Sequence, residues 1–266
     1  MIGKKNLAVF LLTIVFVAGL FLISYAAAIV PNGAQVAAGT PERSDNNATS
    51  PGQDEAQAGN ITELILTGTT ITQAWQGYYG NVSGTVTLED ASGDVLYNWT
   101  GLADVSGEVY ASTNQTVAWA GIQCLNFTAN GTMESAGETA GGTNLAGTNL
   151  TRLHSEFNVG STDGDAVNNT FTEGNSHAEF FTANLNFTIG ECPSTDVFDN
   201  TGAVDGTFEE VLLYEPTTTS VVFAALLESD VTGFDNRAHD FEMLVLEDGH
   251  SGDESSTTYY FFAEIE

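Results

Sequence analysis

Basic residues are almost missing from this chain. Among 266 residues there are five Lys or Arg against 35 Asp or Glu, which gives a formal net charge of −30. A protein that binds nucleic acid needs a basic surface to neutralise phosphates, so the composition excludes that function. Docking onto anionic lipid is disfavoured for the same reason. The acidic composition suits a salty or cation-rich exterior, or simply keeps the protein soluble through charge repulsion.

Cysteine is also scarce, with Cys124 and Cys192 the only two. Outside the cytoplasm such a pair is typically bridged, whereas a metal site would normally need more closely spaced ligands such as C-x-x-C. We therefore predict a disulfide between Cys124 and Cys192. On the chain-entropy account, closing a loop of this length stabilises a fold by about 4 kcal/mol.

Motifs for catalysis are missing too. The four histidines show no H-E-x-x-H or H-x-H spacing, and there is no G-x-S-x-G elbow or phosphate-binding loop. Glu209 and Glu210 form a carboxylate pair of the type that glycosidases use, but a chain this acidic produces such pairs by accident. His239 lies beside Asp240, and no particular serine accompanies them. The sequence therefore predicts a protein that is not an enzyme.

Only one long apolar run is present. Residues 7–30 contain no charge, and Lys4 and Lys5 precede them. As a helix this run would be about 36 Å long, enough to cross a membrane with its lysines in the cytoplasm. Ala26-Ala27-Ala28 also offers a signal-peptidase site before Ile29. Residues 1–30 are thus expected to be a transmembrane anchor or a cleaved signal peptide, which places the rest on the extracellular face of the membrane or in the medium.

The composition changes twice after this run. Residues 31–59 are rich in Ala, Gly, Pro, Asn, Ser and Gln and lack apolar periodicity, so a disordered linker is expected. Residues 60–266 show short apolar runs separated by Gly, Asn, Asp, Ser and Thr, which is typical of an extracellular β-rich domain. A short internal echo, AGGTNLAGTNL, lies at residues 140–150, and residues 131–149 are expected to form an exposed loop.

The clearest local signal is a β-hairpin, in which residues 85–88 and 95–99 flank a glycine-containing turn, EDASGD. Further strands are expected at residues 61–66, 108–112, 116–127, 178–189, 211–214, 220–227, 241–246 and 257–265. Residues 221–227 and 234–245 also suit a helix, although frequent glycine disfavours long helices. The predicted fold class is mainly β: a β-sandwich ectodomain with few short helices, preceded by an N-terminal hydrophobic helix and a flexible linker.

Acceptor motifs for N-glycosylation are frequent. The motif N-x-[ST] begins at Asn47, Asn60, Asn81, Asn98, Asn114, Asn126, Asn130, Asn149, Asn168 and Asn186. Roughly four would arise by chance, so the excess favours a glycoprotein, although Asn and Thr are also common in turns and strands. Trp99 beside Asn98 suggests that this sequon is buried. No sequon follows Asn186, whereas residues 191–266 hold 18 of the 35 acidic residues, which suggests a glycan-free acidic face.

Two kinds of ligand site are considered. Calcium takes several oxygen ligands from loops, and the candidate ligands are Asp90, Asp94, Asp163, Asp165, Asp230 and Asp235, although no loop completes the D-x-[DN]-x-[DN]-G motif. Aromatic residues form either a sugar-stacking platform or part of the core; these are Trp75, Tyr78, Tyr79, Trp99 and Trp119. No cofactor other than calcium is expected.

The run WQGYYGNVSG at residues 75–84 is distinctive. Together with GEVYAS, DAVNNTF, CPST, EEVLLY and DVTGFD further along, it resembles a group of uncharacterised archaeal secreted or cell-surface proteins. The likeness covers most of residues 60–266. It implies an archaeal envelope protein, and no activity or catalytic residue.

The expected function is that of a non-enzymatic cell-surface glycoprotein acting in adhesion, envelope structure or self-assembly. Its partners would be the membrane, through residues 7–30, and copies of itself or other envelope proteins. Residues 61–66 or 257–265 would add to the edge of a neighbour's sheet, because backbone pairing needs no specific side chain. The first alternative is an extracellular carbohydrate- or calcium-binding module, and the second is a secreted hydrolase.

Overall fold

The structure, a computed structural model, describes residues 30–43, 53–99, 106–125, 127, 150–172, 174–249 and 256–266. The apolar run before Val30 and the expected loop at residues 131–149 lie outside these ranges. So do the sequons at Asn47, Asn126, Asn130 and Asn149. Within the described ranges, no helix is both long enough and apolar enough to cross a membrane.

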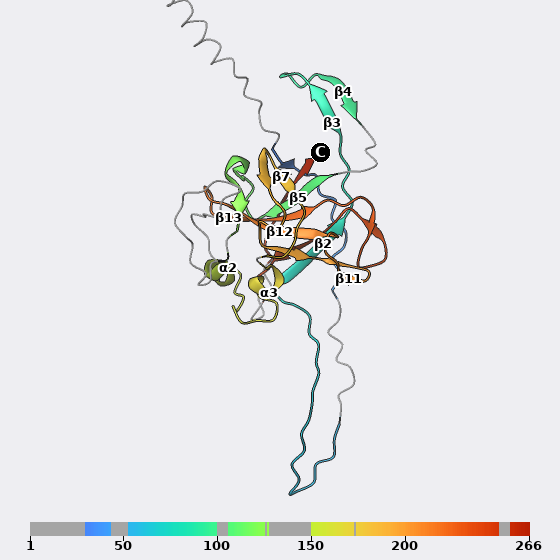
Figure 1. The fold of residues 1–266 in the computed structure, drawn as a ribbon, viewed down its shortest axis with the longest axis vertical. Helices are drawn as coiled ribbons and strands as arrows, with labels where there is room; N and C mark the ends of the chain where they lie inside the picture. Colours follow the sequence, from blue (N-terminus) through green and yellow to red (C-terminus); the bar gives the residue numbers. More distant parts are fainter. Residues whose placement is uncertain are drawn as a thin grey trace, which may run out of the picture.

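The fold is mainly β, as predicted, and is built around one antiparallel sheet (Figure 1). Its central strands are β5 (Gly107–Ser112), β13 (Ser220–Leu226) and β12 (Glu209–Glu215). One side continues through β17 (Tyr260–Ile265) to β1 (Asn32–Gly33), and the other ends in β6 (Gln123–Cys124) and β9 (Ser194–Asp196), which both pair with β12. All these pairings are antiparallel.

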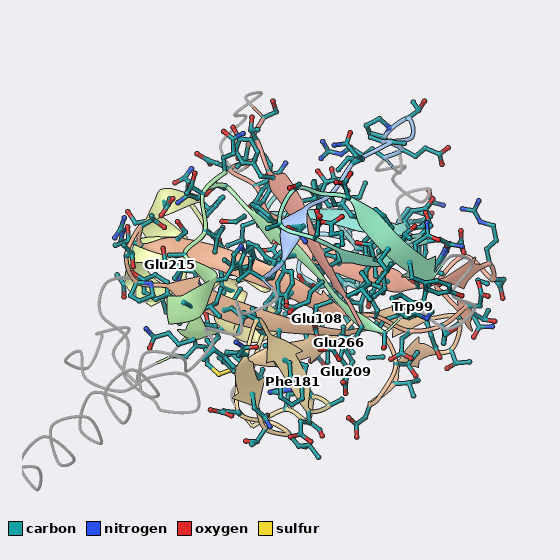
Figure 2. All side chains as sticks on the ribbon, turned by 90° about the horizontal axis from the view of Figure 1, so that it is seen from above. Trp99, Glu108, Phe181, Glu209, Glu215 and Glu266 are labelled. Atoms are coloured by element: carbon teal, nitrogen blue, oxygen red, sulfur yellow. A yellow bond between two sulfur atoms is a disulfide. The ribbon has the colours of Figure 1, made fainter. Side chains whose placement is uncertain are left out.

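Strands β12 and β13 lie in the middle of this sheet, and nearly all their residues are buried. Because both faces of a central strand are covered, its sequence reads as a continuous apolar run instead of alternating. The runs VLLY in β12 and VVFAAL in β13 follow this rule. The two ends of β12 differ from its apolar middle because they carry glutamates. Glu209 and Glu215, both labelled in Figure 2, are nevertheless buried.

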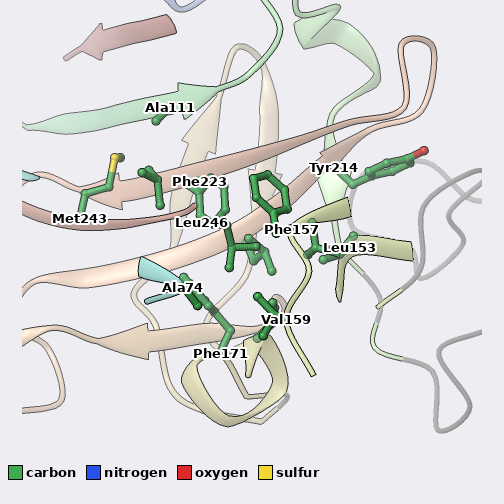
Figure 3. Close-up of a cluster of buried hydrophobic side chains, with 14 of the residues drawn as sticks. Ala74, Ala111, Leu153, Phe157, Val159, Phe171, Tyr214, Phe223, Met243 and Leu246 are labelled. Atoms are coloured by element: carbon green, nitrogen blue, oxygen red, sulfur yellow. The ribbon is translucent and has the colours of Figure 1, made fainter. Parts of the chain in front are cut away.

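A second layer covers one face of the main sheet. It consists of the antiparallel pair β2 (Trp75–Gly80) and β16 (Phe241–Leu246), the latter lying against β13 and β12, with helices α2 (Leu150–Glu156) and α3 (Val167–Thr170) beside it. Phe223 of β13, Met243 and Leu246 of β16 and Phe171 after α3 meet in the core between the layers (Figure 3). At 25 cal/mol per Å² of buried apolar surface, each such side chain contributes about 2 kcal/mol.

The opposite face of the main sheet is covered by a hairpin of β7 (Phe180–Thr182) and β8 (Leu185–Phe187) and by the short helix η1 (Trp119–Gly121). Phe180 and Phe187 stack with ring centroids 4.8 Å apart, and Trp119 packs on Tyr110 of β5. Three further pairs are short: β10 (Phe198–Asp199) with β11 (Gly202–Ala203), β14 (Val231–Thr232) with β15 (Ala238–His239), and β3 (Val86–Glu89) with β4 (Val95–Trp99).

The predicted disulfide between Cys124 and Cys192 is confirmed. Strands β6 and β9 occupy successive stretches of the same edge of β12 and meet at Leu212. The Leu125 N–H donates to the Leu212 carbonyl, and the Leu212 N–H donates to the Pro193 carbonyl, both at 2.9 Å. The disulfide therefore joins two short segments, 68 residues apart in sequence, into one edge partner for β12.

Most predicted strands are present, including the β3–β4 hairpin, but four local expectations differ. Residues 61–66 form no strand, the described part of 116–127 contains only η1 and β6, and residues 178–189 form two short strands, β7 and β8, instead of one. Residues 221–227 and 234–245, for which a helix was the alternative, lie mostly in strands β13, β15 and β16. The linker expected over residues 31–59 begins with a strand, because Asn32 and Gly33 pair with Phe262 and Ala263 of β17.

Candidate functional site

A row of carboxylates crosses one end of the main sheet. Glu264 of β17 lies opposite Glu108 of β5, and Glu108 lies opposite Leu226 of β13. Glu209 of β12 lies opposite Asp196 of β9. Directly paired residues point to the same face of a sheet, so these acids share the face that β7 and β8 cover. Figure 2 shows Glu108, Glu209 and Glu266 gathered near Phe181 of β7, while Glu215 lies far from them.

Glu108 and Glu264 form a buried carboxylate pair, each only 4% exposed. The Tyr110 hydroxyl lies 3.2 Å from Glu108 Oε2 and 3.3 Å from Glu264 Oε2, and the Ala183 N–H donates to Glu264 Oε2 at 2.9 Å. Burial, with the charge of Glu264 beside it, raises the pKa of Glu108 to about 8. Burial likewise raises the pKa of Glu264. At neutral pH the pair therefore holds at least one proton.

Gly107 allows this close approach of β5 to β17. Its φ is +119°, in the left-handed region, and a Cβ atom there would collide with the carbonyl oxygen of Glu264. A side chain at this position would thus push the two strands apart beside the carboxylate pair.

Three carboxylates converge at the other end of the row. One oxygen each from Asp196, Asp205 and Glu209 lies within 4.8 Å of the others, the one such group among the described residues. The Ala178 and Gly206 N–H groups donate to Glu209, whereas Asp196 Oδ1 is buried without a hydrogen-bond partner. Burial chiefly, and the charge of Asp205 in addition, raise the pKa of Asp196. The three oxygens are therefore mutually repulsive unless a proton or a cation lies among them.

We expect Asp205→Asn to stabilise the metal-free protein, since Asp196 would no longer face a second charge. The free energy of unfolding in EDTA at neutral pH should rise by about 0.5 kcal/mol, measured by urea denaturation. Asp54→Asn, an exposed carboxylate outside the row, controls for the change in net charge. A less stable Asp205→Asn protein in EDTA would contradict this account, and comparing both proteins in calcium tests the three oxygens as cation ligands.

Other buried carboxylates accept backbone N–H groups from neighbouring segments. Glu210 accepts from Leu244 at 2.8 Å, Asp240 from Val82 at 2.7 Å, and Glu242 from Phe234 at 3.1 Å. In a chain nearly free of lysine, these hydrogen bonds tie loops and strands together. Glu209 and Glu210, adjacent on β12, bind to segments on opposite faces of the sheet, so they do not face one another as a catalytic pair.

The six aspartates suggested for calcium lie in three separate places, where several of them cap turns. Asp90 accepts N–H bonds from Ser92 and Asp94 at the tip of the β3–β4 hairpin. Asp163 accepts a hydrogen bond from the Gly160 N–H, and Asp165 accepts one from the Thr72 hydroxyl. The Asp230 N–H donates to the Asp240 carboxylate. The Asp235 carboxylate pairs with Arg237 and His239. Although burial opposes it, these bonds to Arg237 and His239 lower the pKa of Asp235 to about 2.

Exposure differs among the described sequons. Asn60, Asn81, Asn98 and Asn186 are exposed, while Asn114 and Asn168 are partly buried. The expected burial of Asn98 is wrong, because Asn98 is itself exposed, on the face of the hairpin opposite Trp99. Asn114 is held on both sides of its amide: Nδ2 donates to Ser220 Oγ at 2.9 Å, and Oδ1 accepts from the Thr116 N–H at 2.8 Å.

The five aromatic residues do not form one platform. Trp75 and Tyr78 pack against the core between the two layers, and Trp119 is buried on the opposite face of the main sheet. Tyr79 is 47% exposed and lies against Phe234 and His239. Trp99 belongs to the β3–β4 hairpin.

The β3–β4 hairpin projects from the body of the protein (Figure 1). Val86 pairs with Trp99 and Leu88 with Tyr97, so all four side chains lie on one face. This apolar face is uncovered, with exposures of 37% for Val86, 50% for Leu88, 58% for Tyr97 and 46% for Trp99. Thr87 and the sequon Asn98 pair on the other face, while Leu96, 80% exposed, lies in a bulge near the turn. The hairpin is therefore amphipathic, with its apolar face open to solvent.

A second uncovered apolar stretch is the 61–66 segment, ITELIL. Ile61, Ile65 and Leu66 are 101%, 90% and 86% exposed. The described residues 53–72 extend away from the body at the end opposite the β3–β4 hairpin (Figure 1). They rejoin it at Thr72, whose hydroxyl donates to Asp165 at 2.6 Å.

Sequence reasoning missed the carboxylate row, because its members are distant in sequence and only strand pairing brings them together. The sequence showed that apolar and polar residues alternate in the hairpin. It did not show that the apolar face would remain uncovered. Comparison with protein-family models, with curated proteins and with solved structures finds nothing that matches this chain.

Proposed function

We propose that this protein is a non-enzymatic glycoprotein of the cell surface with a sandwich-like β domain. The domain would bind other molecules or copies of itself, in adhesion, envelope structure or self-assembly. Residues 7–30 would hold it on the membrane, or cleavage before Ile29 would release it. In either case the apolar run leads directly into the folded domain, because Pro31 is buried and Asn32 starts β1.

The observation that carries this proposal is the amphipathic β3–β4 hairpin. Soluble domains rarely leave the apolar face of a sheet in water unless something docks on it. The opposite face presents Asn98, so a glycan there would keep that side solvated and leave the apolar side free. The described acids of the carboxylate row are largely buried, and most have protein partners, which fits a structural role.

Glycopeptide mapping of the native protein tests the proposal. We expect glycans at Asn60, Asn81, Asn98 and Asn186, which are exposed. Asn114 should remain unmodified, because its Nδ2 already donates to Ser220 and attachment of a sugar would break that bond. Bare asparagine at all four exposed sequons would contradict the glycoprotein assignment. Intact mass from membrane and medium fractions then separates an anchored chain from one beginning near Ile29.

The carbohydrate-binding alternative is best supported by a cleft of about 380 Å³ between α2 and the β12–β13 turn. Asn114, Arg152, Glu156 and Tyr260 are among its lining residues, and this mixture of polar groups and an aromatic ring suits a sugar. Calorimetric titration with oligosaccharides, compared between the native chain and Tyr260→Ala, tests this alternative.

A further inference from the structure

Among the described residues, neither the β3–β4 hairpin nor the extended 61–66 segment has a further strand beside it. The β3–β4 hairpin has only two strands, and an isolated two-stranded hairpin is marginal in water, whereas a third strand makes a sheet much more stable. The 61–66 segment has the apolar composition of a strand but pairs with nothing among the described residues. If it became the third strand, Leu64 and Leu66 would lie on one face and Ile61 and Ile65 on the other.

The two elements cannot meet within one molecule in this structure, because they lie at opposite ends of it (Figure 1). Between molecules they can. We propose that the 61–66 segment of one copy docks on the β3–β4 hairpin of the next copy as an added strand. Such a head-to-tail contact uses different surfaces on the two partners, so each copy retains one free end and an open chain of copies results.

The charge pattern supports a second copy as the occupant. Two molecules with a net charge of −30 repel each other over most of their surface. From residue 64 to residue 88, however, the chain has no charged residue, and this stretch includes most of the 61–66 segment and most of β3. Strand β4, VLYNW, is uncharged as well. Docking therefore brings together the surfaces where repulsion is weakest.

The hairpin tip argues against a lipid surface as the occupant. Glu89, Asp90 and Asp94 lie at the turn between β3 and β4 and are exposed. These carboxylates would oppose contact with anionic lipid, whereas a neighbouring copy needs only to reach the strands behind them. This inference rests on the proposed contact function and names its partner.

Two substitutions test the contact, because each disrupts one of the two surfaces that form it. Ile65→Asp places a charge in the 61–66 segment, and Tyr97→Asp places one on the apolar face of the hairpin. Both positions lie outside the core, so unfolding curves of the domain should match the native protein, although Tyr97→Asp also removes the ring contact with Trp99 inside the hairpin. Val36→Asp is the matched control, since Val36 is 60% exposed and lies outside both elements.

The full chain is studied in mild detergent by sedimentation at increasing concentration, with salt at about 1 M to shorten the Debye length to about 3 Å. We expect the native chain and Val36→Asp to form a growing series of oligomers. Each of the two test variants alone should remain monomeric, with its apparent dissociation constant raised at least tenfold. An equimolar mixture of the two should stop at dimers, because only one intact pair of surfaces remains.

Three outcomes would overturn the proposal: a native chain that stays monomeric, an Ile65→Asp chain that assembles like the native one, or a mixture that stays monomeric. Loss of assembly in Tyr97→Asp alone would instead show hairpin-to-hairpin contact. A monomeric chain that still carries its glycans at the cell surface would leave the proposed function standing and remove only this contact.

Discussion

Replacing both Cys124 and Cys192 by serine is expected to lower the free energy of unfolding by about 4 kcal/mol. The bridge closes a loop of 68 residues and so removes much of the conformational freedom of the unfolded chain. It also holds β6 and β9 end to end along β12, where Leu125 and Pro193 bind to successive backbone groups of Leu212. Urea denaturation followed by tryptophan fluorescence measures the loss.

Reduction of the native protein provides the control for this experiment. The reduced native chain should unfold at the same urea concentration as the double serine variant, because both lack the same covalent link. A loss below about 1 kcal/mol would contradict the expectation and would mean that pairing with β12 alone holds the two segments together.

Glu108→Gln is expected to make the protein more stable in mild alkali while changing little in acid. The Glu108 carboxyl has an ordinary pKa of 4.5 and a folded pKa of about 8. Between these values the folded protein retains a proton that the unfolded chain has released, so stability is full below the lower pKa and falls as pH rises to the upper one. Glutamine has no such proton. At pH 9 the variant should exceed the native protein by roughly 3 kcal/mol, and at pH 4 the two should be similar.

Glu215→Gln is the matched control, because Glu215 is also buried but its pKa moves the other way. Although burial opposes it, hydrogen bonds from Thr218 and Thr217 lower the pKa of Glu215. Its contribution is present above its ordinary pKa and is lost as pH falls. Glu215→Gln should therefore weaken the protein near neutral pH and retain the native alkaline decline. Equal alkaline declines in the native protein and Glu108→Gln would refute the role of Glu108.

The same direction applies to other acids of the chain. Burial raises the pKa values of Glu210, Glu242 and Glu264 as well as that of Glu108. Each of these carboxyls makes the folded state more stable in acid than in mild alkali. Part of the alkaline decline in the free energy of unfolding should therefore remain in Glu108→Gln. The protein is therefore expected to be most stable in mildly acidic solution.

Local patterns in the sequence predicted those parts of the fold that local chemistry controls. The turn EDASGD predicted the β3–β4 hairpin, because Asp90 caps the turn through bonds to Ser92 and Asp94. The continuous apolar runs predicted β12 and β13. The 61–66 segment shows the limit of this reasoning, since strand-forming composition does not provide a partner strand, and none lies beside it within the described residues.

The sequence by itself determined the mainly β class, the acidic, lysine-poor character and the single possible disulfide, because these depend on composition and on short-range alternation. Only the tertiary structure decided which acids meet. Glu108 and Glu264 are 156 residues apart, and they become neighbours only because β5 pairs with β17 in one register. The register also decided which hairpin side chains share a face, and packing decided that this face stays open. Such outcomes depend on contacts between distant segments, which no local pattern contains.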